Sequence, residues 1–91
     1  MPEMRLQVVM SLDVISLRTA VDELDTRIAK LIRERILTAR AIVDSKRAQG
    51  LLITDPIREG VIISRVAKEI AVADRESIEQ IYDALFREAK K

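Results

Sequence analysis

The stretch LDVISLRTAVDELDTRIAKLIRERILTARAIVDSKRAQG, residues 12–50, decides the fold of this chain. It contains no Pro and no Gly before Gly50, and its apolar side chains recur at alternating spacings of four and three, as they do along one face of an α-helix. The pattern predicts a single helix over about residues 12–47, which at 1.5 Å per residue is about 50 Å long. Gly50 ends this helix because glycine readily adopts the left-handed conformation that closes many helices. The apolar stripe consists of Leu17, Val21, Leu24, Ile28, Leu31 and Ile42.

The remaining sequence predicts two shorter helices, over about residues 55–72 and 74–89. Thr54 or Asp55 caps the first of them, and Pro56 fits its first position, where a missing N–H does no harm. Only two Gly and two Pro in the chain leave little room for sheet turns. We therefore expect an all-α domain over residues 12–91, after an N-terminal extension (residues 1–11) whose order the sequence leaves open. The apolar positions of the two short helices are Ile57, Val61, Ile62, Val66 and Ile70, and Ile78, Ile81, Tyr82, Leu85 and Phe86.

The predicted helices differ greatly in length. Two short helices that pack beside each other cannot cover an apolar stripe of about 50 Å. Because the stripe needs a second copy of itself, we predict an intertwined homodimer in which the long helices pair across a two-fold axis.

The composition argues against several classes of function. The net charge is +1, acidic and basic residues are interspersed, and Tyr82 and Phe86 are the only aromatic residues, so we expect no nucleic-acid partner. The chain has no Cys and no His, which removes thiolate chemistry, the commonest metal ligand and the usual general base. No apolar run approaches the roughly 20 residues of a membrane span and no signal sequence is recognisable. We expect no metal, no cofactor, no membrane contact and a cytoplasmic location.

Arg35 and Lys46 are cations on a helix face that otherwise carries apolar side chains. They are eleven residues apart, which places them within about 20° of the same face and about 16 Å apart along the axis. A guanidinium on a buried stripe is costly unless an anion meets it. With the polar cluster of residues 55–59, the two cations suggest a pocket between helices for a small anion. An alternative stays open, in which Arg35 forms a salt bridge within the dimer and Lys46 lies in the exposed last turn of its helix. In this alternative Asp55 only caps its helix, and Arg58 and Glu59 are solvated.

The order and spacing of the charged residues resemble the all-α class of chorismate mutase, whose three-helix chains form an intertwined dimer. Arg35 follows Arg18 by seventeen residues, Lys46 follows Arg35 by eleven, and Asp55 follows Lys46 by nine, as in that family. The resemblance covers about residues 12–89. The residues that carry it are Leu17-Arg18, Val21-Asp22-Glu23-Leu24-Asp25, Ile28, Leu31, Arg35, Lys46 and Asp55-Pro56-Ile57-Arg58-Glu59.

The resemblance implies conversion of chorismate to prephenate, a step of aromatic amino acid biosynthesis in the shikimate pathway. This rearrangement is unimolecular and needs no nucleophile, metal or cofactor. It does need a dianion folded into a chair-like conformer, and positive charge beside the C–O bond that breaks. The resemblance implies that Arg35, together with Arg18 from the partner chain, holds the carboxylates of chorismate. Lys46 would hydrogen-bond the ether oxygen.

The resemblance also assigns the polar cluster at the start of the second helix to the substrate. It implies that Arg58 supports the anionic substrate and that Glu59, with Asp55, holds the ring hydroxyl. The end of the chain departs from the family, which carries a small polar residue late in the third helix and a Gln or Glu one turn later that contacts the ether oxygen. Ala89 occupies the first of these positions, and Glu88 is the candidate substitute for the second.

Two other functions remain open from the sequence. A related lyase that acts on isochorismate uses the same fold and similar cations. The departure at the end of the chain instead favours a non-enzymatic helical dimerisation or regulatory domain. A weak mutase that a partner enzyme activates lies between these alternatives.

Overall fold

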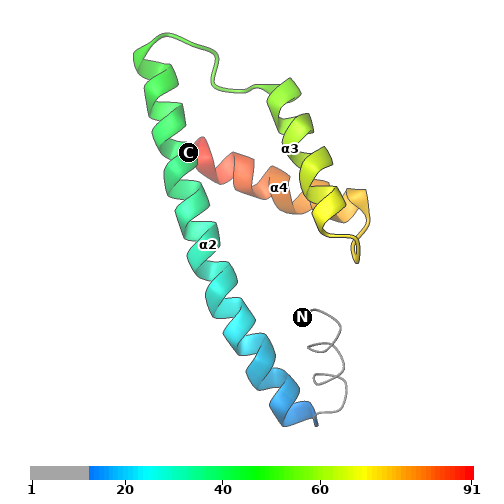
Figure 1. Ribbon diagram of the computed structural model, residues 1–91. Coiled ribbons are helices and arrows are strands. Elements are labelled where there is room, and N and C mark those ends of the chain that lie inside the picture. Colours follow the sequence, from blue (N-terminus) through cyan, green and yellow to red (C-terminus); the bar gives the residue numbers. More distant parts are fainter. Residues whose placement is uncertain (1–12) are drawn as a thin grey trace. The chain divides into compact units, whose positions relative to one another are not determined.

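The computed structural model describes residues 13–91 and confirms the predicted all-α fold (Figure 1). Its helices are α2 (Val14–Ala48), α3 (Pro56–Glu69) and α4 (Arg75–Ala89), and no strand occurs in the described residues. The expectations for residues 1–11 and for a helix start at residue 12 lie outside that range. Within the described residues, the boundary that differs most from the prediction is the end of α3, which stops at Glu69 rather than near residue 72. Ile70 leaves helical geometry there, and a short turn leads to α4.

An aspartate caps the start of each helix. The carboxylate of Asp13 accepts a hydrogen bond from the Ser16 backbone N–H at 2.9 Å, and Asp74 accepts one from Ser77 at 2.7 Å. Because these bonds stabilise the charged form, the backbone N–H of Ser77 lowers the pKa of Asp74. Asp55, rather than Thr54, caps α3. These side chains satisfy N–H groups that have no partner within the helix, and they fix where each helix begins.

Gly50 and Pro56 have the roles that the sequence predicts. Gly50 follows α2 with φ of +70°, in the left-handed region, and Pro56 is the first residue of α3. A Cβ built on Gly60 would meet no atom within 4 Å among the described residues. Packing among the described residues of one chain therefore does not require a glycine at this position.

The core of residues 34–91 lies between α3 and α4. It consists of Ile63 and Val66 from α3 and of Ile78 and Phe86 from α4, and Ile78 is only 1% exposed. The apolar pattern of the sequence omitted Ile63 and gave Ile57 the same weight as Val66. The structure instead leaves Ile57 82% exposed. The apolar residues of α3 cover more than one face of that helix, and the contact with α4 selects which face is buried.

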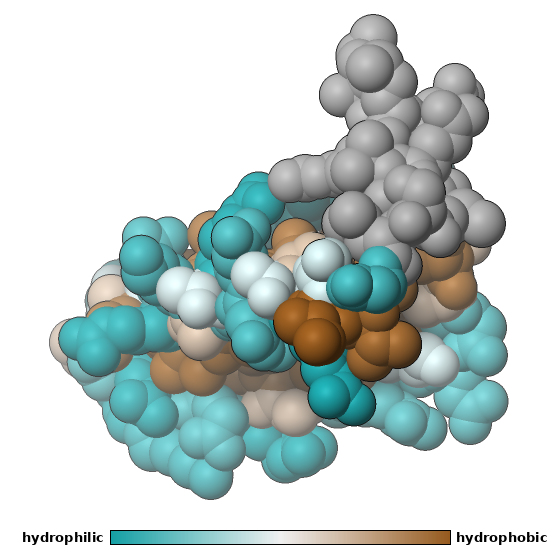
Figure 2. Space-filling model, turned by 90° about the horizontal axis from the view of Figure 1, so that it is seen from below, coloured by the Kyte–Doolittle hydropathy of each residue, from teal (hydrophilic) through white to brown (hydrophobic). Residues whose placement is uncertain are grey.

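The chain divides into two compact units, residues 1–33 and 34–91. Within the described part of the first unit, seven large apolar side chains of α2 are between 40% and 76% exposed, whereas Leu17 is half-buried. Figure 2 shows hydrophobic residues (brown) at the surface among hydrophilic ones (teal). No helix of residues 13–91 is long and apolar enough to cross a membrane. The exposed apolar residues of this unit are Val14, Ile15, Val21, Leu24, Ile28, Leu31 and Ile32.

Candidate functional site

Arg35 lies against the only two aromatic rings of the chain. Its guanidinium carbon is 5.2 Å from the centroid of the Tyr82 ring and 5.4 Å from that of Phe86. The two rings meet edge to face, with centroids 6.0 Å apart and an interplanar angle of 62°. Both distances fall in the range of cation–π attraction, and Phe86 belongs to the core. The rings therefore hold the guanidinium at the edge of the core and leave its N–H donors for other partners.

Arg35 and Lys46 are half-buried cations without a carboxylate partner among residues 13–91. Lys46 donates one hydrogen bond, to the carbonyl oxygen of Ile53 at a long 3.4 Å. An ammonium group has three donors, so this single weak bond leaves most of its capacity unused. Neither cation is fully solvated, and within the described residues neither has its charge matched. Both are therefore suited to meet an anion from outside the chain.

The first turn of α3 holds the predicted polar cluster. Asp55 accepts a hydrogen bond from the Arg58 backbone N–H at 3.1 Å, and both side chains are exposed. Glu59 is half-buried, and its Oε2 lies 2.7 Å from Nζ of Lys90, at the end of α4. One part of the alternative interpretation is thus correct, because Asp55 does cap the helix. Another part is wrong, because Glu59 is not solvated but paired.

The end of α4 is bound to α2 by two arginines. Arg40 Nε donates to the carbonyl oxygen of Glu88 at 3.2 Å, and Arg47 Nη2 donates to that of Lys90 at 3.3 Å. The Glu88 carboxylate itself accepts a hydrogen bond from Lys91 Nζ at 2.6 Å. That bond lowers the pKa of Glu88, and nearby cationic charges, Arg40 among them, act in the same direction. The side chain predicted as a substitute donor is therefore a charged acceptor whose partner in the structure is Lys91.

The structure does not bring all predicted site residues together. Arg35, Lys46 and Glu59 are half-buried within residues 34–91, and Asp55 and Arg58 lie exposed at the start of α3. Arg18 is exposed on α2, in the other compact unit. The interpretation that left Lys46 exposed is wrong, because Lys46 is half-buried and donates a hydrogen bond to the carbonyl oxygen of Ile53.

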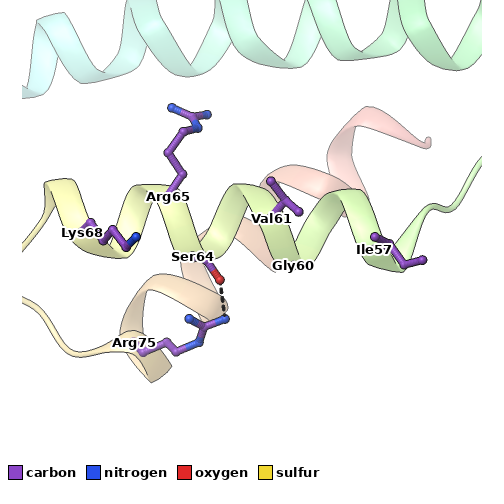
Figure 3. Close-up of a pocket in the computed structure, with 7 residues that line it drawn as sticks. All are labelled: Ile57, Gly60, Val61, Ser64, Arg65, Lys68 and Arg75. Carbon is purple, nitrogen blue, oxygen red and sulfur yellow. Dashed lines mark hydrogen bonds between the residues drawn. The ribbon is translucent and has the colours of Figure 1, made fainter.

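A groove of about 550 Å³ lies elsewhere, along α3 and the start of α4 (Figure 3). No predicted site residue lines it. Arg75 donates to the Ser64 hydroxyl at 3.1 Å and also pairs with Glu79. Arg65 and Arg75 lie on opposite sides of α3, so their two guanidinium groups do not converge on one point. The lining residues are Ile57, Gly60, Val61, Ser64, Arg65, Lys68 and Arg75.

Sequence reasoning missed the contacts that organise the candidate site. It placed Tyr82 and Phe86 on an apolar face but did not connect them with Arg35. It gave Arg40 no role, and it gave Lys90 only that of a cation at a helix C-terminus. The scarcity of aromatic residues was a signal for the first of these, because two rings in 91 residues that fall one turn apart can form one surface. No sequence signal distinguishes Arg40 or Lys90 from other surface cations.

The chemistry available at this site is the fixation of charge. Arg35 and Lys46 supply donors for negative groups, and Glu59 supplies an acceptor beside Lys90. Within residues 13–91, no group of three or more His, Cys, Asp or Glu side chains is arranged to hold a metal ion. Guanidinium groups suit planar carboxylates, and an ammonium group suits a point contact. The arrangement can therefore orient an anion that carries carboxylates.

Fold and site together define an all-α protein that presents half-buried, unmatched cations within its described residues. Residues 17–91 match the sequence profile of the family described as chorismate mutase type II. The chain belongs to this family. A relative named chorismate mutase, from Methanocaldococcus jannaschii, is 40% identical over 52 residues, which cover 57% of this chain and 52% of the relative. The chain thus spans about half the length of the curated relative that it matches. No solved structure gives a significant match.

Proposed function

We propose that the protein catalyses the rearrangement of chorismate to prephenate. The observation that carries this proposal is the pair of half-buried cations, Arg35 and Lys46, without carboxylate partners in residues 13–91. Partly desolvated cations are costly unless an anion meets them, and chorismate is a dianion. Membership of the family and the name of the relative support this choice of anion.

The proposed mechanism needs only positioning and fixed charge. In chorismate, an ether C–O bond breaks while a new C–C bond forms within the same molecule, and no proton leaves or enters. Arg35, held by Tyr82 and Phe86, presents paired N–H donors to one carboxylate and so selects the folded conformer. Lys46 donates to the ether oxygen, where negative charge builds as the bond breaks.

The remaining polar residues complete the proposed site around the ring of the substrate. Glu59 accepts a hydrogen bond from the ring hydroxyl, with Asp55 nearby at the helix start, and Arg58 adds positive charge to the same turn. Glu88 contacts the substrate only after its carboxylate has left Lys91, its partner in the structure. All of these groups can act without a cofactor.

We expect purified protein to convert chorismate to prephenate, with chorismate loss followed by its ultraviolet absorbance and prephenate identified by chromatography. Typical enzymes turn over about 1–10³ times per second. Release of pyruvate from isochorismate, with chorismate left intact, would instead identify a lyase. Absence of any reaction above the uncatalysed rate would reject both enzymes and favour a regulatory helical domain.

We also propose that the active form is a homodimer in the cytoplasm. Seven large apolar side chains of α2 in residues 14–32 are at least 40% exposed in one chain. Fully burying one such side chain stabilises a structure by about 1.5–3 kcal/mol, so a second copy of this face is a favourable partner. The absence of Cys suits a reducing compartment. In the dimer, Arg18 of one chain would reach the substrate held by Arg35 of the other.

Mixed dimers test this arrangement directly. Arg18→Ala chains and Arg35→Ala chains should each be nearly inactive alone, because each dimer lacks the same arginine in both sites. When the two variants are unfolded together and refolded, we expect about a quarter of the unmodified activity to return, since half of the dimers are mixed and each mixed dimer has one complete site.

Each variant refolded alone is the control and should regain nothing. Sedimentation equilibrium should give a mass near twice 10.3 kDa. If mass spectrometry detects mixed dimers and activity stays absent, Arg18 does not serve the site of the partner chain. A stable folded monomer with full activity would reject the dimer itself.

A further inference from the structure

The ion pair between Lys90 and Glu59 differs from the other ion pairs of residues 13–91. The remaining ones join residues three or four apart along the chain, whereas Lys90 and Glu59 are 31 residues apart. Glu59 lies in the first turn of α3, and Lys90 follows the end of α4. Their atoms are 2.7 Å apart, and their side chains are only 28% and 26% exposed. A pair of this kind loses solvation when it forms, so it is a poor source of stability unless it also fixes a geometry.

The backbone around Lys90 is itself fixed. Its carbonyl oxygen accepts a hydrogen bond from Arg47, and the carbonyl oxygen two residues earlier accepts one from Arg40. Both arginines belong to α2, on either side of Lys46 in the sequence. The ammonium group that meets Glu59 therefore projects from a helix end that α2 holds in place, rather than from a free terminus.

We propose that Lys90 is a positioning residue of the substrate site, which acts by holding and neutralising the Glu59 carboxylate. This inference rests on the proposed function, in which Glu59 accepts the ring hydroxyl of a dianion. An unpaired carboxylate would repel a dianionic substrate, and Lys90 offsets that repulsion. Because Lys90 occupies Oε2 of Glu59, the other carboxylate oxygen stays free to accept the hydroxyl.

The effect should fall mainly on substrate binding. The ring hydroxyl takes no part in the bonds that break and form, so its contact is similar in the bound substrate and in the transition state. Loss of such uniform binding raises KM and changes kcat little. For Lys90→Gln we expect KM to rise about tenfold, with kcat changed less than about threefold, and we expect Lys90→Arg to restore most of the affinity.

The matched control is Arg87→Gln, which removes one positive charge from an exposed position in the same last turn of α4. It should leave KM unchanged. In the double variant Glu59→Gln/Lys90→Gln, KM should equal that of Glu59→Gln alone, because Lys90 acts through the carboxylate. If Lys90 had a purely structural role, the rise in KM caused by Lys90→Gln would add to the rise caused by Glu59→Gln.

The outcomes separate this inference from the function on which it rests. If the unmodified protein does not transform chorismate, the proposed function fails and the role of Lys90 fails with it. If the unmodified protein is active but Lys90→Gln and Arg87→Gln have equal KM values, or if the losses of Glu59→Gln and Lys90→Gln add, the inference about Lys90 alone is overturned.

Discussion

Replacement of Arg35 by alanine should lower kcat/KM for chorismate by about 10²–10³-fold. The substitution removes the guanidinium that we place on a substrate carboxylate, and it leaves the Tyr82 and Phe86 rings without their cation. A charge-assisted, two-pronged contact of this kind is stronger than a neutral hydrogen bond, and water cannot reproduce its geometry. Steady-state kinetics would measure the loss, and circular dichroism would check that the helices remain.

Arg33→Ala is the matched control for this prediction. Arg33 precedes Arg35 by two residues, so it points to a different side of α2, and it is exposed. We expect its removal to change kcat/KM by less than about twofold. If Arg35→Ala and Arg33→Ala were equally active, the cation held by the aromatic rings would have no part in catalysis.

Replacement of Lys46 by alanine should lower kcat by about 10²–10³-fold and change KM much less. The ether oxygen gains negative charge only as its bond to carbon breaks, so a donor at that oxygen stabilises the transition state more than the bound substrate. Lys46 has the capacity for this contact, because its partner among residues 13–91 is one carbonyl oxygen, that of Ile53, at 3.4 Å, and an ammonium group carries three donors. Steady-state kinetics at saturating chorismate would measure kcat.

Two variants sharpen the test of Lys46. Lys68→Ala removes an exposed lysine of α3 that lies outside the proposed site, and it should retain full activity. Lys46→Arg keeps the charge but changes the shape of the donor, and we expect it to recover only part of the rate. An equal rise in KM for Lys46→Ala, with kcat unchanged, would assign Lys46 to ground-state binding and contradict its proposed role at the ether oxygen.

Much of the fold follows from local sequence, because local interactions set helices and their ends. The spacing of apolar residues predicted all three helices, and the position of Pro56 and the φ of Gly50 agree with their expected roles. The end of α3 was less predictable. Ile70 fits the apolar pattern, yet it leaves the helix where the chain turns toward the Asp74 cap. Which apolar face of α3 is buried depends on α4, and the sequence therefore ranked Ile57 too high.

The candidate site divides in the same way. The order and spacing of six charged residues are enough to recognise the family, since spacing is a property of the sequence alone; they are Arg18, Arg35, Lys46, Asp55, Arg58 and Glu59. The contact partners of these residues cannot be recognised from the sequence, because Arg35 and Phe86 are 51 residues apart and Lys90 and Glu59 are 31 residues apart.

The sequence by itself determined three helices, the family, and the placement of two cations, Arg35 and Lys46, on an otherwise apolar helix face. Only the tertiary structure decided that the two aromatic rings hold Arg35 and that Lys90 holds Glu59. The physical reason is range. Backbone hydrogen bonds and caps act over three or four residues and leave a local signal in the sequence. Contacts between different helices depend on how the packed helices meet and leave no such signal.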